Sequence, residues 1–507
     1  MRLMQFTAAR IDVDWTELAY NWFDDDSIAE FRKEFGKEVT EFAALVESLL
    51  EREWFKRVWV RQEVFLARQA VVFCGASELG WDEFRNAAAI LARELCRPQL
   101  SSMAYYVMNT SRIYLHELWY ALKKAKCTDP RDRVYGMLAL IDSEGAGLPD
   151  VDYKFSTPEA YTAIAVHHLR KARYLQLLLS CELAPNRMPE LPSWVPDWST
   201  SSTNNALGNV SLFAMDTTAC VKLPMGPRGG VLRVPGVVKK ASRVKTVEMM
   251  GSTHSQNTDA ILRLLQVVST PDTYYVGGHE SFVDAVCRTL LLGELRHTHM
   301  PQRSKDISLE ELRGASHHLR SLLLHTTSDK SSSEYLAHYK RLLEAGINAY
   351  EGCVLFLTED SFVGLGPPMM SPGDTLFFPW GSFFPILMRP APTTDALDVE
   401  KGQQQQWLIV GPCFVSGLMS GEILYGPLPP NYSVVAERRS ETRKPYIHKS
   451  IHRMVVHGDR VVSTERDSEF EQERVQKVFG VGVDDLESVT PEIAINKGLP
   501  ITWVDFV

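Results

Sequence analysis

Three short blocks rich in aromatic residues and proline constrain the fold of this chain more than any other sequence feature. They occupy residues 54–63 (WFKRVWVRQE), 128–136 (TDPRDRVYG) and 191–199 (LPSWVPDWS). Tryptophan and tyrosine bury large apolar surfaces while keeping one polar atom to satisfy, and proline fixes the backbone angle φ. These blocks are therefore typical of buried helix faces, helix starts and turns that proline holds against a core.

Hydrophobic spacing around the first block predicts mainly helical structure. Apolar residues recur every three or four positions over residues 38–69, which predicts one long helix. The apolar run 70–75 ends in glycine and predicts a short strand. Two further helices are predicted over residues 81–95 and 101–126.

The second block has the chemistry of a helix start. Asp129 has the side chain of an N-cap, Pro130 suits the first helical position, and Asp132 places a negative charge in the first turn. The run Thr157-Pro158-Glu159 repeats the cap and the proline, and predicts a helix that extends through Leu169.

Changes in composition divide the chain. Residues 201–230 are polar and glycine-rich, so we predict a linker between a first domain over 1–200 and a mixed strand and helical region over 231–350. Within that region, residues 231–238 are predicted as strand, turn and strand, and 258–350 return to helical spacing. Residues 351–507 are predicted as a β-rich domain, because short apolar runs separated by turn residues are typical of an antiparallel barrel or sandwich. These strands are predicted at 354–357, 362–366, 375–378, 385–388, 407–410 and 413–415. The predicted fold class is therefore α+β and multi-domain, with a mainly helical N-terminal region containing a short sheet.

Composition narrows the compartment and the partners. The net charge of −9 over 507 residues argues against non-specific binding of nucleic acid. The N-terminal residues do not have the pattern of a secretory signal, and no apolar run is long enough to span a membrane. The eight cysteines are scattered without a C-x-x-C pair, which favours reduced thiols in the cytosol or nucleus, and we predict a cytoplasmic location.

The common catalytic motifs are missing from the sequence. It contains no phosphate-binding glycine loop, no dinucleotide fingerprint, no H-E-x-x-H zinc helix and no G-x-S-x-G elbow. His297 and His299 could approach one metal ion, but scattered histidines at a solvated helix end are the better interpretation. We therefore predict no metal and no cofactor, and lean against an enzyme.

Polar residues of the blocks have two interpretations each. The Gln62-Glu63 pair could act as an acid or base beside aromatic side chains. The better interpretation is a helix that buries Phe55 and Trp59 while Arg57, Arg61 and Glu63 point to water or pair locally.

The other two blocks and a later basic stretch are equally ambiguous. Residues 131–133 could bind an anion at a helix N-terminus, or satisfy the cap and nearby carboxylates, which is favoured. Trp194 and Trp198 could stack on a ligand ring, although prolines and tryptophans at this spacing more often fix a loop to the core. The basic stretch 438–452 could contact nucleic acid or acidic lipid, but its glutamates favour a solvated loop.

Taken together and in this order, the blocks resemble the later half of the heterokaryon incompatibility (HET) domain of filamentous fungi. The family motif residues, which the resemblance assigns to structure or interaction, are Trp54, Phe55, Arg57, Trp59, Gln62, Glu63, Asp129, Pro130, Arg131, Asp132, Tyr135, Pro192, Trp194, Pro196, Asp197 and Trp198. Segments 357–367, 372–374, 411–422 and 498–501 are similar to the C-terminal regions of long family members. The A-L-S-Y-x-W-G and D-x-x-C-I-N-Q blocks of the family, which belong to a half similar to TIR-type domains, have no match before Trp54. We therefore expect a chain that lacks this half, as a divergent paralogue, a truncated gene model or a regulator.

The resemblance implies a role in fungal non-self recognition, in which fusion of incompatible cells leads to growth arrest and death. It implies action by contact with other proteins, of unknown identity and oligomeric state. Two alternatives of another class remain: an accessory protein or enzyme of a fungal secondary-metabolite gene cluster, and a TIR-like NAD-consuming enzyme.

Overall fold

The computed structural model describes most of the chain in separate segments and forms two compact units. The described residues are mainly 48–94, 113–118, 125–141, 149–170, 174–200, 219–223, 230–267, 280–292, 294–297, 300–306, 352–392, 405–429, 432–439, 446–457 and 460–507, with short pieces before residue 48 and a few isolated positions. The first unit comprises Met1–Tyr161, Trp198–Ser201 and His297–Arg303, and the second comprises Thr162–Asp197, Ser202–Arg296 and Ser304–Val507. Both helices and strands are present, so the predicted α+β class is confirmed.

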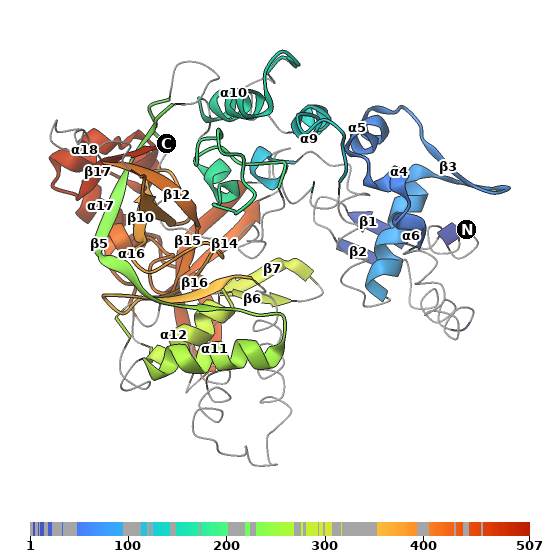
Figure 1. The fold of residues 1–507 in the computed structure, drawn as a ribbon. Helices are drawn as coiled ribbons and strands as arrows, with labels where there is room; N and C mark the ends of the chain where they lie inside the picture. Colours follow the sequence, from blue (N-terminus) through green and yellow to red (C-terminus); the bar gives the residue numbers. More distant parts are fainter. Residues whose placement is uncertain are drawn as a thin grey trace. The chain divides into compact units, whose positions relative to one another are not determined.

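The described part of the first unit contains helices, two small hairpins and two 3-10 turns. Its elements in chain order are β1 (Ile11–Asp14), β2 (Ala19–Trp22), α4 (Glu53–Lys56), α5 (Val58–Leu66), β3 (Val71–Cys74), β4 (Ser77–Gly80), α6 (Trp81–Glu94), η1 (Leu115–Glu117), α9 (Asp132–Tyr135) and η2 (Leu138–Leu140). The strands pair only locally, β1 with β2 and β3 with β4, both antiparallel. Figure 1 shows the β3–β4 hairpin projecting away from α4, α5 and α6.

The predicted helix over residues 38–69 is wrong in its central part. Arg57 is extended (φ −73°, ψ 132°) and separates α4 from α5. Its neighbours form a parallel bridge with Lys126, in which Val58 N–H donates to the Lys126 carbonyl at 3.2 Å. Because this backbone pairs with a distant segment, the helix ends at Lys56 and begins again at Val58. Residues 38–47 lie outside the described residues.

The other helix predictions have mixed outcomes. The strand at 70–75 and the helix at 81–95 are confirmed as β3 and α6. Residues 101–112 lie outside the described residues, and the described part of that prediction contains the single 3-10 turn η1.

The predicted helix after Thr157 is confirmed as α10 (Thr157–Leu169), but its cap is one residue earlier. Ser156 N–H donates to Glu159 Oε2 at 2.9 Å, and Glu159 N–H donates to Ser156 Oγ at 3.4 Å. This reciprocal pair is a capping box, so Ser156 occupies the position expected for Thr157.

The centre of the second unit is a closed ring of five strands. They are β5 (Leu232–Met249), β10 (Thr375–Pro379), β11 (Ile386–Pro390), β12 (Gln406–Pro412) and β17 (Ile501–Phe506). β10 pairs with β11, β11 with β12, β12 with β17, β17 with β5, and β5 with β10. The pairs are antiparallel except β12–β17, which is parallel. Together with the strands that extend from β5, this ring is the predicted β-rich structure.

β5 is longer than the sequence suggested, because the predicted strand, turn and strand at 231–238 form one strand with no turn. Gly236 allows this: a Cβ there would lie 2.2 Å from the Phe378 carbonyl oxygen, so only glycine lets β10 approach so closely. The C-terminal part of β5 leaves the ring and pairs with β8 (Val354–Thr358), which continues through β9 (Val363–Gly366) to β13 (Phe414–Val415). The strands predicted from 354 to 415 are therefore all present.

Helices and smaller elements surround these strands. α11 (His254–Gln266) packs against β5 and β8, and α12 (Phe282–Leu290) against β9, beneath the sheet in Figure 1. The remaining elements are η3 (Gln176–Ser180), β6 (Glu294–His297), β7 (Met300–Asp306), α16 (Glu422–Tyr425), β14 (Tyr432–Arg439), β15 (Tyr446–His457), β16 (Arg460–Arg466), α17 (Ser468–Phe479), η5 (Val483–Ser488) and α18 (Pro491–Asn496). Most of the predicted helical residues from 307 to 350 lie outside the described residues.

The basic stretch 438–452, for which a solvated loop was favoured, lies largely on strands. β14 and β15 pair in antiparallel register across it, for example Glu437 with His448, while residues 440–445 lie outside the described residues.

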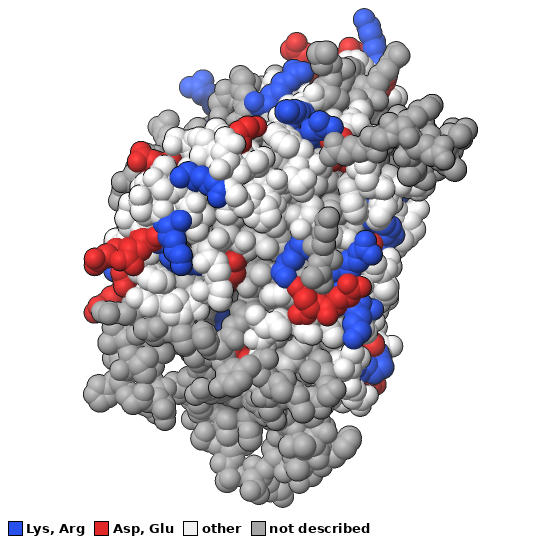
Figure 2. Space-filling model, turned by 90° about the vertical axis from the view of Figure 1, so that its left-hand side faces the viewer, with Lys and Arg blue, Asp and Glu red and all other residues white. Residues whose placement is uncertain are grey.

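On the face of the molecule drawn in Figure 2, Lys and Arg side chains lie beside Asp and Glu side chains at several places. The charge on this described surface is therefore mixed rather than of one sign.

Candidate functional site

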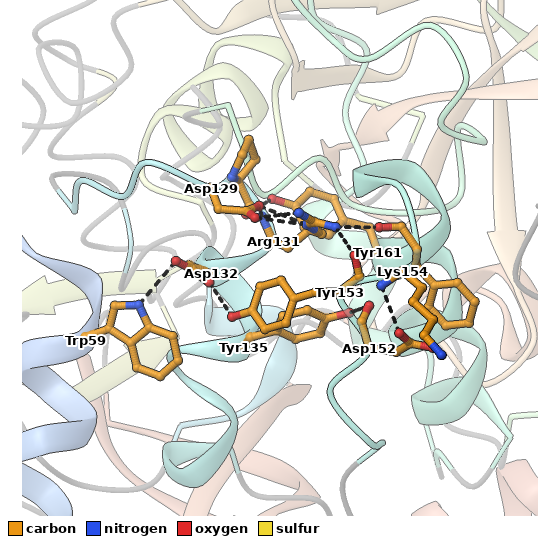
Figure 3. A network of polar contacts seen from close by, with 11 residues as sticks. Trp59, Asp129, Arg131, Asp132, Tyr135, Asp152, Tyr153, Lys154 and Tyr161 are labelled. Carbon is orange, nitrogen blue, oxygen red and sulfur yellow. Dashed lines mark hydrogen bonds and ion pairs between the residues drawn. The ribbon is translucent and has the colours of Figure 1, made fainter.

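The second aromatic block is the centre of a polar network in the first unit, which we call the motif cluster: Trp59, Asp129, Arg131, Asp132, Tyr153 and Tyr161 (Figure 3). Asp132 accepts hydrogen bonds on both carboxylate oxygens. Trp59 Nε1 donates to Oδ2 at 3.3 Å, and the Tyr153 hydroxyl donates to Oδ1 at 2.7 Å. This carboxylate thus joins the first block to the second.

Arg131 holds the turn before α9 together. Its guanidinium forms a bidentate ion pair with Asp129, with Nε–Oδ1 at 2.9 Å and Nη2–Oδ2 at 2.6 Å. Its Nη1 donates to the Tyr153 and Phe155 carbonyls, both at 2.7 Å. The Arg131 guanidinium holds the pKa of Asp129 below its ordinary value, and Asp129 raises the pKa of Arg131. Both side chains are therefore charged at neutral pH, and each is the ion-pair partner of the other.

The predicted helix start is two residues early, because the N-cap is Arg131 instead of Asp129. α9 begins at Asp132, and Asp129 Oδ1 instead accepts the Arg131 N–H at 3.0 Å. The Asp132 N–H donates to the Asp129 carbonyl at 3.0 Å, so Pro130 lies within a turn that precedes the helix. The helix is short because the backbone after it continues through a second turn into η2.

Tyr161 connects the cluster to the third block. Its hydroxyl donates to the Pro130 carbonyl at 2.6 Å, and its ring packs edge-on against Trp198 with 5.0 Å between centroids. Both rings are almost fully buried. Residues from all three blocks therefore meet in the first unit, through Trp59, Asp132 and Trp198.

Close packing supports this arrangement around Tyr135 and Gly136. The Tyr135 hydroxyl donates to the Asp152 carbonyl at 3.1 Å, and its ring contacts Tyr153 edge-on. A Cβ on Gly136 would lie 2.9 Å from Val58 Cγ1 and 3.3 Å from Trp59 Cδ2. Glycine at this position therefore lets the first two blocks approach each other.

The remaining residues of the first block divide between core and surface. Phe55 is buried, as the sequence predicted, and stacks on Phe84. Trp59 was also predicted to be buried but is half-buried, and Trp54 is 41% exposed. Gln62 is half-buried, and its Oε1 has no hydrogen-bond partner within the described part of the chain.

Two charged residues of that block, Arg57 and Glu63, pair with each other. Arg57 Nη2 lies 4.0 Å from Glu63 Oε1, and both side chains are largely exposed, as predicted. Arg61 was expected to point to water or to pair locally, and it is buried. It follows Val58 by three positions, which places it on the same inward face of α5.

Most of the third block belongs to the second unit. Trp194 is fully buried and its Nε1 donates to the Gly230 carbonyl at 3.0 Å. Ser193 N–H donates to the Val507 carbonyl, and Ser193 Oγ accepts the Ile409 N–H at 3.0 Å. Asp197 accepts the Met188 N–H at 2.9 Å. Pro192 and Pro196 flank these anchors, so the block is fixed to the barrel strands, as the favoured interpretation expected.

The polar groups of the motif cluster bind one another, as is typical of residues that support a fold. Its two carboxylates are already occupied by indole, phenol and guanidinium donors. Burial and the bond to Asp132 raise the pKa of Tyr153 to about 12, so its hydroxyl stays protonated at neutral pH. Within the described residues no group of His, Cys, Asp and Glu could hold a metal ion, and no helix is long and apolar enough to cross a membrane. His297 lies at the end of β6, and His299 lies outside the described residues.

Sequence reasoning missed Tyr153 and Tyr161. The signal for Tyr161 was present, because it lies inside the apolar helix that begins after Ser156. Tyr153 gave no local signal, because its role depends on partners more than twenty positions away in the chain.

Comparisons with known proteins complete this description. No family model matches the chain, and no solved structure matches it. Among curated proteins, the chain is similar to a fungal heterokaryon incompatibility protein. That relative is heterokaryon incompatibility protein 6, OR allele, of Neurospora crassa, which is 22% identical over 458 residues. The alignment covers 74% of this chain and 65% of the relative, so the chain spans less than two thirds of its length. The similarity supports a relation to heterokaryon incompatibility proteins in general.

Proposed function

We propose that this protein acts in non-self recognition in filamentous fungi, and that it triggers growth arrest and death of fused cells by contact with another protein in the cytoplasm. The observation that carries the proposal is the similarity to a Neurospora crassa heterokaryon incompatibility protein over 74% of the chain. The motif cluster supports it, because the first two aromatic blocks that resemble the HET family meet in the first unit, where Trp198 of the third block joins them.

Contact with a protein is favoured by what the cluster leaves exposed. The polar atoms of the second block are used internally, whereas several large apolar side chains of nearby elements face solvent. They are Trp54 on α4, Leu66 on α5, and Val71 and Phe73 on β3, with Phe73 70% exposed. Exposed apolar side chains of this size are typical of protein-binding surfaces when they occur together.

The proposal is tested by inducible expression in a filamentous fungus. We expect the wild-type chain to arrest growth, and Phe73→Ser to abolish the arrest because it removes the most exposed of these side chains without touching the cluster. The matched control is Met249→Ser, which removes a side chain 59% exposed on β5 of the second unit and is expected to leave the arrest intact.

Protein levels are compared by immunoblot so that loss of effect is not loss of protein. A wild-type chain that leaves growth unchanged in strains carrying different incompatibility alleles would count against the proposal. Equal loss in both variants would count against contact through the first unit.

A further inference from the structure

The second unit contains an open pocket beside the third block. Its volume is about 520 Å³, in the range of small-molecule sites. The wall is formed by the segment 183–193, the start of β5, β12 and the end of β17. The lining is mostly apolar, with Leu183, Met188, Leu191, Val231 and Leu408 among its residues.

Arg187 is the cation in this lining. Its Nη2 donates to the Pro192 and Val195 carbonyls, the latter at 2.6 Å, which fixes the guanidinium against the third block. No ion pair among the described residues includes Arg187, although the Asp197 carboxylate, which accepts the Met188 N–H, is near enough to act against the lowering of its pKa. Burial lowers the pKa of Arg187, which reports the cost of holding this charge away from water.

A half-buried guanidinium whose hydrogen bonds go to carbonyl oxygens retains a positive charge, and the cost of burial outweighs the attraction of Asp197. An anion in the pocket would neutralise it, and guanidinium donors match a carboxylate in geometry. The apolar walls would at the same time take up a hydrocarbon body. Glu190 is the acidic residue of the lining and is exposed, so it opposes an anion from the rim.

We infer that this pocket binds a small organic carboxylate with an apolar body, the carboxylate at Arg187 and the hydrocarbon against Leu183, Leu191 and Leu408. The inference does not depend on the proposed function, because it concerns a pocket of the second unit alone.

Binding is measured on the full chain by isothermal titration with n-octanoate. n-Octanol serves as the probe with the same body and no charge, and acetate as the charge without the body. We expect saturable binding of one octanoate per chain. Octanol should bind at least about tenfold more weakly, because it lacks the charge-assisted hydrogen bond. Acetate should bind at least about tenfold more weakly, because it lacks the hydrocarbon body that the apolar walls would bury.

Variants separate the parts of the site. Arg187→Gln is expected to weaken octanoate binding about tenfold or more and to leave octanol binding unchanged. Glu190→Gln is expected to tighten octanoate binding, because it removes the opposing charge. Arg263→Gln, on α11 and paired with Glu248, is the matched control and should change nothing. Val231→Phe narrows the pocket without touching the guanidinium and should weaken octanoate and octanol alike.

Absence of octanoate binding by the wild type would overturn the inference, whatever the variants do. Equal affinity for octanoate and octanol would show a purely apolar pocket and overturn the role of Arg187. If Arg187→Gln does not fold, the wild-type comparison of the two probes and the Glu190→Gln result still decide the question.

Discussion

Replacing Asp132 by alanine should loosen the first unit locally, because this carboxylate joins two of the three blocks. The variant removes the acceptor for Trp59 Nε1 at 3.3 Å and for the Tyr153 hydroxyl at 2.7 Å. A hydrogen bond to a charged group is worth about 1.5–3 kcal/mol. Asp132 is half-buried and Tyr153 is 48% exposed, so solvent screening favours about 1 kcal/mol for each bond.

The total expected cost is about 2 kcal/mol. Alanine gains up to about 0.7 kcal/mol of helix propensity, and loses about 0.3–1 kcal/mol of favourable charge in the first turn of α9. These two effects roughly cancel. Asp132→Asn keeps one acceptor oxygen and one of the two bonds, so it should cost about 1 kcal/mol.

A chain of two units does not unfold in one step, so a local measurement is needed. Native-state hydrogen exchange, read by mass spectrometry on peptides covering α5 and α9, gives the free energy of local opening. We expect the Asp132→Ala variant to lower that free energy in both peptides while peptides from β10 and β11 are unchanged. An effect below about 0.5 kcal/mol, or equal effects of alanine and asparagine, would refute the assignment of Asp132 as the connecting acceptor.

Three further predictions follow from other contacts. The pKa of Tyr153 is raised to about 12 in the folded protein, so the stability that its hydroxyl contributes is complete below the unfolded pKa near 10 and is lost as pH rises toward 12. The difference in local opening free energy between wild type and Tyr153→Phe should therefore shrink from about pH 10 to about pH 12. A difference that stays constant over this range would contradict the prediction. Gly136→Ala should cost about 1–3 kcal/mol by the same exchange measurement, because its Cβ would lie 2.9 Å from Val58 Cγ1, and no change would show that the first block can move away. Asp374 is 1% exposed and forms a bidentate pair with Arg389 at 2.7 and 2.9 Å. Asp374→Asn should therefore lower the free energy of local opening by about 3 kcal/mol or more in exchange peptides that cover β10 and β11. A loss below about 1 kcal/mol would refute the pair as a support of these strands.

Local signals in the sequence predicted the elements well where the cause of the element is itself local. α6 has a helical hydrophobic period, α10 follows from the cap and the proline at its start, and the strands from 354 to 415 follow from short apolar runs between turn residues. The break at Arg57 could not be predicted, because it depends on a bridge to Lys126, far along the chain. The continuous β5 escaped prediction for a related reason. Pro235-Gly236 has the composition of a turn, and only the approach of Phe378 shows that the glycine is needed for packing between strands.

The candidate site was predicted in part. Asp129, Arg131 and Asp132 were singled out by the pattern of a helix start, and all three are in the motif cluster. Their partners Tyr153 and Tyr161 lie outside the blocks, so a search restricted to the blocks could not find them. The closed order of the barrel strands is also beyond local pattern, since the parallel pairing of β12 with β17 joins segments separated by about a hundred residues.

The motif cluster indicates how resemblance and function are related in this chain. The charged groups of the cluster are bound internally: Asp129 pairs with Arg131, and Asp132 accepts hydrogen bonds from Trp59 and Tyr153. Substitutions at these residues should therefore act first on folding. We propose that resemblance in such residues reflects a shared scaffold, and that recognition of a partner depends on side chains that the scaffold leaves exposed, such as Phe73. The two kinds of residue should then separate by experiment. Asp132→Ala should lower local stability and reduce activity only as far as the fold is lost, while Phe73→Ser should remove activity from a chain whose exchange protection is unchanged.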